Sequence, residues 1–145
     1  MTEFGPRLGD QLCFALYAAS GALTRVYAPL LAPLGITYPQ LLVMMALWER
    51  DDVSLSALAK RVHLAKSTMT PLIRRLEARG LVTRRRSAAD ERQSRIFLTA
   101  PGRSLAAAGQ NVTQEAFCRT GLQKEEAEDL LKRCHLLLER IEEKA

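Results

Sequence analysis

Residues 53–86 read VSLSALAKRVHLAKSTMTPLIRRLEARGLVTRRR, and this stretch decides the fold. Ser54 is a suitable N-cap for a short helix over 55–62. A second helix is predicted over 66–79, with Gly80 as its C-terminal stop. Two short helices joined by a tight turn, the second rich in small polar and basic residues, are typical of a helix-turn-helix.

Two predicted strands follow the second helix directly. They cover 81–86 and 95–99, and the charged segment SAADERQ bridges them. A β-hairpin directly after a helix-turn-helix makes a winged helix. A further helix is predicted over 39–49, with Pro39 suited to its first turn. The winged helix-turn-helix core is therefore expected to cover about 39–100.

Helices flank this core on both sides. Apolar residues recur at three- and four-residue steps over 8–27, until Pro29 disturbs the pattern and Gly35 closes it. After the hairpin, helices are predicted over 101–117 and 124–144. The apolar stripes of these helices have no core of their own, so we expect them to meet each other and a second copy of the chain.

The predicted fold class is mainly α with a small β-hairpin wing. A winged helix-turn-helix domain is joined to a helical dimerisation domain, which is made of about 8–34 and 101–144 within a single unit, 1–145. The predicted assembly is a homodimer.

Composition excludes several classes of protein. The 145 residues are 48% hydrophobic, but no run of eighteen apolar residues exists, so no membrane-spanning segment is expected. Three cysteines without CxxC spacing predict neither a disulfide framework nor a zinc site, and no cofactor is predicted. The chain is expected to be cytoplasmic, with its thiols reduced at rest.

The positive charge is concentrated in the middle of the chain. Residues 60–95 contain eleven Lys and Arg and three acids, a net charge of +8 against +5 for the whole chain, which leaves −3 for the remainder. A solvated helical face would usually mix the signs more evenly. This distribution favours contact with the phosphates of double-stranded operator DNA.

Particular residues are expected to contact DNA. On the second helix they are the small polar and basic residues of its exposed face: Lys66, Ser67, Thr68, Thr70, Pro71, Arg74 and Arg75. Pro71 lies early in this helix, where a missing N–H is expected to cost little. On the hairpin, phosphate contacts are predicted for Arg84, Arg85 and Arg86, and at its tip Arg92 would enter the minor groove with Asp90 as its brace. The alternative is that the hydroxyls only cap the helix and the arginines are solvated.

The segments DERQSRIFLT and STMTPLIRRLEARGLVTR resemble the MarR family of winged-helix repressors. QLCFALYAAS, VYAPLL and GITYPQLLVMMALWE resemble its organic-hydroperoxide-sensing branch, the OhrR-type regulators. The resemblance covers nearly the whole chain. LAKSTMT is more basic than the DSGT-like stretch of many relatives, which leaves the preferred DNA sequence open.

This resemblance implies a role for four residues. Cys13 matches the peroxide-sensing thiol, and Tyr27 and Tyr38 match two tyrosines whose hydroxyls bond that sulfur. In the two-cysteine subtype a second thiol traps the oxidised sulfur as a disulfide between subunits, and Cys118 stands where it is expected. Without the resemblance, Cys13 would be interpreted as core filling.

The chemistry of the thiol adds a geometric expectation. The reactive form is the thiolate, and hydrogen-bond donors favour it. Cys13 is predicted to lie a turn or more inside its helix, too far in for the helix dipole to help. Tyr27 follows it by fourteen residues, about 21 Å along a helix, so the contact should come from the partner subunit. Tyr17 is expected to line the pocket, with Leu12, Phe14, Leu16 and Met44 among its apolar walls.

The resulting hypothesis is a repressor that releases its operator when an organic hydroperoxide oxidises Cys13. One alternative is a MarR-like repressor that binds a small phenolic ligand in the same interface pocket. Another is a thiol peroxidase that uses Cys13 and Cys118 catalytically, although it leaves the basic middle unexplained. Cys134, on the apolar stripe of the last helix, is expected to be core, and His63 to be structural.

Overall fold

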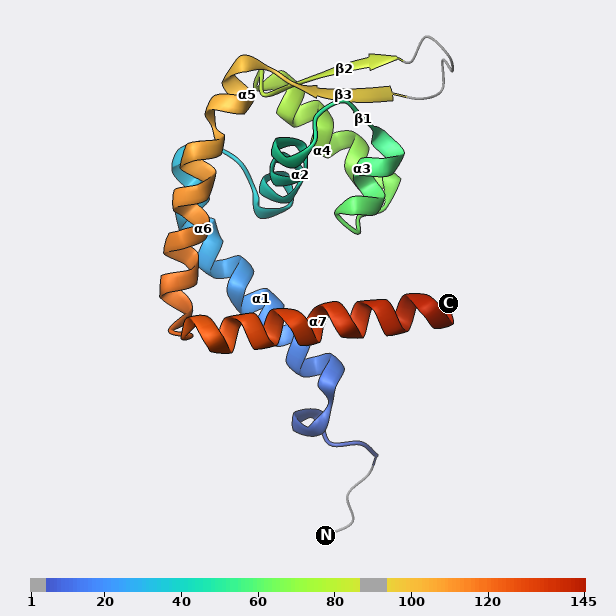
Figure 1. The fold of residues 1–145 in the computed structure, drawn as a ribbon, viewed down its shortest axis with the longest axis vertical. Helices are drawn as coiled ribbons and strands as arrows, with labels where there is room; N and C mark the ends of the chain where they lie inside the picture. The colour runs from blue at the N-terminus through green and yellow to red at the C-terminus, as the bar shows by residue number, and fades with distance from the viewer. Residues whose placement is uncertain (1–4, 87–93) are drawn as a thin grey trace.

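The computed structural model describes residues 5–86 and 94–145, and it is mainly helical with one small sheet (Figure 1). This confirms the predicted fold class. The elements, in chain order, are η1 (Leu8–Asp10), α1 (Leu12–Leu31), η2 (Ala32–Leu34), α2 (Tyr38–Glu49), β1 (Val53–Ser54), α3 (Leu55–Arg61), α4 (Lys66–Ala78), β2 (Val82–Arg86), β3 (Ser94–Leu98), α5 (Ala100–Ser104), α6 (Ala106–Thr120) and α7 (Lys124–Lys144).

The helix-turn-helix forms where the sequence predicts it. The Ser54 hydroxyl caps α3 by accepting a hydrogen bond from the Ala57 N–H at 3.1 Å. Gly80 ends α4 in the left-handed conformation, at φ +73°, and Leu81 N–H bonds back to the Leu76 carbonyl at 3.0 Å. Pro71 differs from expectation. It is the sixth residue of α4, beyond the four N-terminal N–H groups that lack helical partners, so it does remove a helical hydrogen bond.

The sheet has three antiparallel strands in the order β1-β3-β2. The β2–β3 hairpin was predicted, whereas β1 was not. β1 is only two residues long, and it exists because Val53 pairs with Ile96 and Ser54 with Arg95. The wing is therefore hydrogen-bonded, through β3, to the segment that leads into α3.

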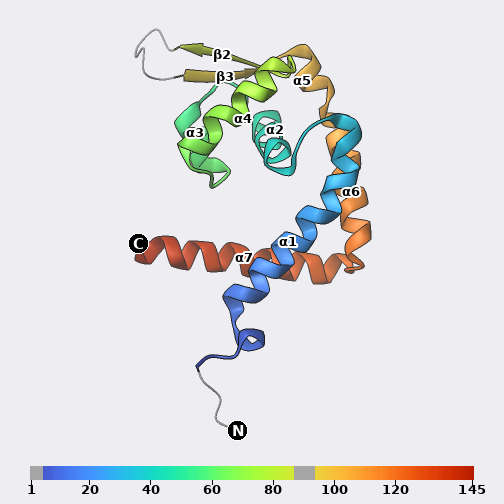
Figure 2. The same ribbon diagram turned by 180° about the vertical axis from the view of Figure 1, so that it is seen from behind.

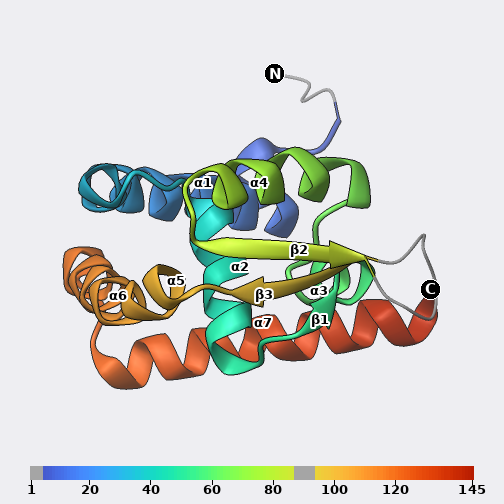
Figure 3. The same ribbon diagram turned by 90° about the horizontal axis from the view of Figure 1, so that it is seen from above.

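The winged domain packs around α2. In the view from above, α2 passes behind the sheet, and α4 lies alongside β2 on the side away from β3 (Figure 3). The Thr37 hydroxyl and the Gln40 side chain form a capping box at the start of α2, and Pro39 lies in its first turn, as expected. The buried side chains come from α2, α4 and the sheet, and the largest fully buried ones include Leu41, Met44, Leu47, Met69, Ile73, Leu76 and Ile96.

The helix predicted over 101–117 is two helices, α5 and α6, with Leu105 between them. Both helices are tied to α2 through Trp48. Its indole N–H donates to the Gly102 carbonyl at 2.9 Å, and a Cβ built on Gly109 would lie 2.5 Å from the Trp48 ring. These contacts hold the start of α6 against the winged domain.

The first helix also differs from its predicted bounds. Residues 8–10 form a separate 3-10 turn, α1 starts at Leu12, and it continues through Pro29 to Leu31. Gly35 closes the segment at φ +67°. α1 packs along α6, and its N-terminal part runs on below the level of α7 (Figures 1 and 2).

α7 projects from the end of α6 and buries none of its own residues in the protomer. Its apolar stripe is exposed, with Leu131 and Ile141 each 57% accessible, and Cys134 is partly covered within the protomer. Across the described ranges 5–86 and 94–145 no single helix is long and apolar enough to cross a membrane. α1 with η2, and α2, reach that length and composition only as a pair bent by 74°.

Candidate nucleic-acid interface and thiol site

One face of α4 is buried and the opposite face is open. Met69, Leu72, Ile73 and Leu76 anchor the helix in the core. Helical periodicity then places Ser67, Pro71 and Arg74 in a row pointing directly away from the core, and all three are exposed. Lys66 and Thr70 flank this row on one side, and Thr68 and Arg75 on the other. The Thr70 hydroxyl donates a hydrogen bond to the Lys66 carbonyl at 3.2 Å.

The three wing arginines do not share one face, because side chains alternate along a strand. Arg84 is half-buried on the face that carries Ile96, and its Nε donates to the Ser94 hydroxyl at 3.0 Å. Arg85 lies on the other face, with its guanidinium 5.0 Å from the centre of the Phe97 ring. Arg86 is exposed at the end of β2. The predicted tip residues, Asp90 and Arg92, lie outside the described residues.

Several basic residues of the middle segment serve the fold. Arg61 pairs with Glu49 at 3.1 Å, and Arg95 pairs with Asp52 at 2.5 Å. The Arg79 guanidinium donates to the Gly35 carbonyl. Charge counting along the sequence did not separate these residues from the outward-facing ones, because their partners lie 12, 43 and 44 residues away.

A second place of interest is the pair formed by Tyr27, near the end of α1, and Tyr38, the first residue of α2. Their ring centres lie 4.7 Å apart and the planes are tilted by 47°. Both rings are half-buried against the core of the winged domain. Burial raises the pKa of Tyr27, as does the neighbouring Tyr38, and burial also raises the pKa of Tyr38. Both phenols therefore stay protonated and able to donate at neutral pH.

Cys13 lies at the far end of α1 from this pair. It is the second residue of the helix and is exposed. The expectation that it lies a turn or more inside the helix is wrong, since α1 starts only at Leu12. Negative charge is favoured within the first turn of a helix.

The walls predicted for the thiol pocket do not close around Cys13 in one chain. Leu12, Phe14 and Tyr17 are exposed, with Tyr17 78% accessible, and Leu16 is half-buried. Met44 is fully buried in the winged domain. Cys118 is exposed near the end of α6, and the three cysteines are free thiols. Within a protomer the structure thus brings the two tyrosines together but not Cys13.

Sequence reasoning missed two features. Asp51, after α2, accepts hydrogen bonds from the Leu98 N–H at 3.0 Å and from Arg103 at 2.9 Å, and so joins α2, the wing and α5.

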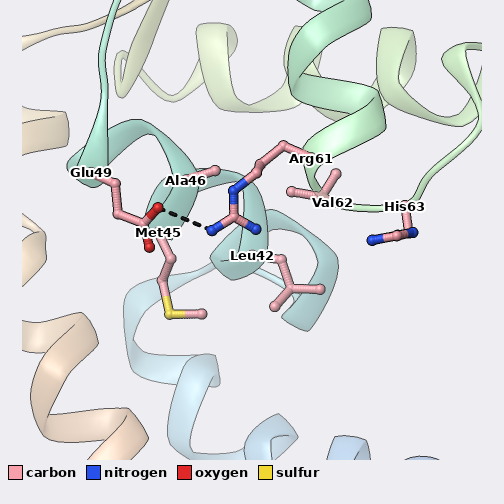
Figure 4. Close-up of a pocket in the computed structure, with 7 residues that line it drawn as sticks. All are labelled: Leu42, Met45, Ala46, Glu49, Arg61, Val62 and His63. Atoms are coloured by element: carbon pink, nitrogen blue, oxygen red, sulfur yellow. Dashed lines mark hydrogen bonds and ion pairs between the residues drawn. The ribbon is translucent and has the colours of Figure 1, made fainter. Parts of the chain in front are cut away.

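The second feature is a cavity of about 260 Å³ between α2 and the end of α3 (Figure 4). It is lined by Leu42, Met45, Ala46, Glu49, Arg61, Val62 and His63. His63 stands in the α3–α4 turn at φ +57°. Among residues 5–86 and 94–145 no group of three or more His, Cys, Asp or Glu could hold a metal ion.

Comparison with known proteins identifies the family. The MarR family model matches residues 36–94, from just before α2 to the start of β3. The organic hydroperoxide resistance transcriptional regulator of Bacillus subtilis (strain 168) is 40% identical over 124 residues, which are 86% of this chain and 82% of that protein. The HTH-type transcriptional regulator TtmR of Methylorubrum extorquens (strain PA1) is 51% identical over 98 residues, 68% of this chain and 50% of that protein.

AbfR of Staphylococcus epidermidis is similar in structure as well as in sequence. Reduced AbfR bound to DNA is 32% identical with a TM-score of 0.77, covering 93% of this chain and 94% of that one. Disulfide-formed AbfR is 33% identical with a TM-score of 0.64, covering 95% and 91%. These relatives are DNA-binding regulators rather than enzymes, so the thiol peroxidase alternative finds no support among them. The chain belongs to the MarR family of winged-helix transcriptional regulators.

Proposed function

We propose that this regulator is a homodimeric repressor that senses organic hydroperoxides through Cys13 and leaves its operator when that thiol is oxidised. The observation that carries the proposal is the Tyr27–Tyr38 pair, two protonated phenols whose ring centres lie 4.7 Å apart. Such a pair supplies two hydrogen-bond donors for one sulfur. The similarity to the hydroperoxide resistance regulator of Bacillus subtilis supports the same assignment.

The sulfur has to come from a second copy of the chain. α1 is one continuous helix, and the fourteen residues from Cys13 to Tyr27 span about 21 Å along it. If two α1 helices cross antiparallel about a twofold axis near Ser20, Cys13 of each copy lies level with the partner's Tyr27. Small residues at the crossing, Ser20 and Gly21, allow the helices to approach closely.

The exposed apolar faces support this dimer. Large hydrophobic side chains are open to solvent on both α1 and α7, and they are Leu12, Phe14, Tyr17, Leu23, Leu130, Leu131, Leu136, Leu138 and Ile141. Burying such a surface against a second copy removes apolar area from water at about 25 cal/mol per Å². An apolar surround for Cys13, completed by the partner, would favour organic hydroperoxides over hydrogen peroxide.

The redox steps follow thiol chemistry. The Cys13 thiolate attacks the peroxide O–O bond and takes one oxygen as a sulfenic acid, while the alkoxide leaves and is protonated to the alcohol. The thiol of Cys118 from the partner then attacks that sulfur, which forms a disulfide and releases water. AbfR has been seen reduced, overoxidised and disulfide-formed, and the present chain has a TM-score of 0.77 to the DNA-bound reduced form, 0.77 to the DNA-bound overoxidised form and 0.64 to the disulfide-formed protein.

In the reduced dimer, the two α4 helices would enter successive major grooves about one DNA turn apart. Ser67 and Pro71 would face base edges. The other exposed residues of α4 would contact base edges or phosphates, and they are Lys66, Thr68, Thr70, Arg74 and Arg75. Arg85 and Arg86 would contact the backbone from the wing, and Arg92, braced by Asp90, would enter the minor groove. Arg84 would contribute mainly by shaping the wing.

A gel shift on the DNA upstream of its own gene tests this function. The reduced protein should bind, cumene hydroperoxide should release it, and dithiothreitol should restore binding. Cys13→Ser should bind as the wild type does but ignore peroxide. Wild-type protein that stays bound while Cys13 is oxidised would sink the proposal.

The cavity between α2 and α3 favours a second candidate, release by a small phenolic ligand. Its lining includes the apolar side chains of Leu42, Met45 and Val62, and His63 offers a polar contact, whereas Arg61 is already paired with Glu49 (Figure 4). Mass spectrometry of Cys13 after stoichiometric peroxide separates the two candidates. Release by a phenol with Cys13 still reduced, together with no response to peroxide, would favour the ligand.

A further inference from the structure

Recognition helix α4 is connected directly to the segment that carries the tyrosine pair. Arg79 is the C-cap residue of α4, and its guanidinium reaches back to donate to the Gly35 carbonyl. Gly35 lies three residues before Tyr38, in the connection between α1 and α2. The two residues are 44 positions apart in the chain, so this contact is made by the tertiary fold.

Both ends of this contact are held rigidly. Gly80 and Leu81 close the end of α4 with backbone hydrogen bonds of 2.9 and 3.0 Å to Glu77 and Leu76, which fixes the backbone that bears Arg79. The Gly35 N–H bonds to the Leu31 carbonyl at 3.0 Å, and its φ of +67° is one that glycine adopts readily. The main chain is therefore fixed at both ends of the contact, and the Arg79 side chain joins them.

Gly35 is also shaped to receive the guanidinium. A Cβ at this position would come within 3.0 Å of three guanidinium atoms of Arg79. The guanidinium, with Nη1 nearest, therefore occupies space that the Cβ of any other residue would fill. Ile36, the next residue, is buried in the same core cluster as Ile73 and Leu76 of α4, so the turn that receives Arg79 is itself anchored in the core of the winged domain.

We propose that Arg79 is a positioning residue that passes the redox state of the tyrosine site to α4. This inference rests on the proposed function. Loss of the Cys13 sulfur from the tyrosine pair would let Tyr38 and the turn before it shift, and the Arg79–Gly35 contact would move the end of α4 with them. Without Arg79, α4 stays anchored by its buried face, but the turn moves without it.

The test compares operator affinity in the reduced and the peroxide-oxidised states for wild type and Arg79→Ala. The variant should oxidise at Cys13 as the wild type does, and its reduced form should bind DNA within about twofold. Its ratio of oxidised to reduced Kd should fall roughly fivefold or more, the lower end of typical allosteric coupling. Arg79→Lys, which keeps a donor of similar reach, should restore much of that ratio.

Each other result has a clear meaning. A variant ratio within twofold of the wild-type ratio overturns the proposal. Equal weakening in both states, with the salt dependence reduced by about one charge per subunit, would instead make Arg79 a phosphate contact. If Arg79→Ala fails to fold, Arg79→Met, which retains the apolar stem, is judged by the same ratio. Wild-type protein that does not respond to peroxide would refute the proposed function itself, and so the two failures are distinguishable.

Discussion

Tyr27 and Tyr38 lie with their ring centres 4.7 Å apart, one near the end of α1 and the other at the start of α2. This pair stands where α1 joins the winged domain. A group that binds both phenols therefore holds α1 and α2 in one relative position, and a group that leaves them frees both. The pair is suited to reporting the state of a sulfur to the DNA-binding part of the chain.

Tyr38→Phe removes one hydroxyl and keeps the ring that packs against Tyr27. A hydrogen bond to a charged group contributes about 1.5–3 kcal/mol, so Cys13 oxidation by cumene hydroperoxide should slow by at least about tenfold. Operator affinity of the reduced protein should change little. Stopped-flow loss of the thiol measures the rate. An unchanged rate in Tyr38→Phe would remove this phenol from the sensing chemistry.

Asp51→Asn should destabilise the protein at neutral pH. Burial would raise the pKa of Asp51, but hydrogen bonds from Arg103, Leu98 and Asp52 and the charge of Arg103 outweigh it and lower the pKa below 3.8. A carboxyl whose pKa is lower in the folded state stabilises the fold fully at pH values above its pKa in the unfolded state. This stabilisation is lost as the pH falls through the folded pKa. The variant should lose about 1–2 kcal/mol at pH 7.

Urea unfolding at a fixed protein concentration, at pH 7 and at a series of pH values that falls well below 3.8, measures this effect. The difference between wild type and Asp51→Asn should shrink as the pH falls through the lowered folded pKa, where the wild-type carboxyl becomes protonated. Asp129→Asn is the control, because the Asp129–Arg133 pair is exposed and its loss should cost well under about 1 kcal/mol. A gap that stays constant with pH would mean that Asp51 acts through shape rather than charge.

Local signals made the DNA-binding half predictable. A hydroxyl cap at Ser54, a glycine stop at Gly80 and alternating strands each act within a few residues, and each formed as expected. β1 escaped prediction because two residues form a strand only when β3 is alongside. The division of α5 from α6 is set by Trp48 binding Gly102, a contact across 54 residues that no local pattern reveals.

The thiol site was predictable only in its parts. Resemblance to the family named Cys13, Tyr27 and Tyr38, and the fold brings the two tyrosines together, but the chain as a monomer leaves Cys13 exposed. The helix start was misjudged because apolar spacing begins at Leu8, whereas residues 8–10 form a 3-10 turn. Basic residues that hydrogen-bond to other parts of the fold, such as Arg79, could not be distinguished in the sequence from those that face outward.

Gly109→Ala should destabilise the joint between the winged domain and α6. The new methyl would lie 2.5 Å from the Trp48 ring, which its hydrogen bond to Gly102 prevents from moving freely. Overpacking of this kind costs about 1–3 kcal/mol, partly offset by the better helix propensity of alanine. Thermal unfolding measures the loss against Gly9→Ala, a site with no atom within 4 Å. Equal melting temperatures for the two variants would contradict the packing described for α2 and α6.

Arg74→Ala should weaken DNA binding across all sequences. Arg74 points outward from α4 beside Ser67 and Pro71, where phosphate contact requires only charge. Because the proposed dimer carries two copies of Arg74, the slope of log Kd for the dimer against log salt should fall by about two, roughly one for each copy. Lys124→Ala removes the same charge at the start of α7 and should leave the slope unchanged. A slope reduced equally in both variants would indicate a general field effect and not a contact.

Cys118→Ser should abolish the covalent dimer that peroxide produces. Cys118 is exposed near the end of α6, accessible to a sulfenic acid on Cys13 of a partner subunit, whereas serine offers no thiol to condense with it. Non-reducing gels after one equivalent of cumene hydroperoxide measure the band. Cys134→Ser is the matched control and should retain it, because Cys134 lies on a different helix and is partly covered. A band that survives Cys118→Ser but vanishes in Cys134→Ser would transfer the resolving role to α7, and with it the part of the dimer that oxidation pulls together.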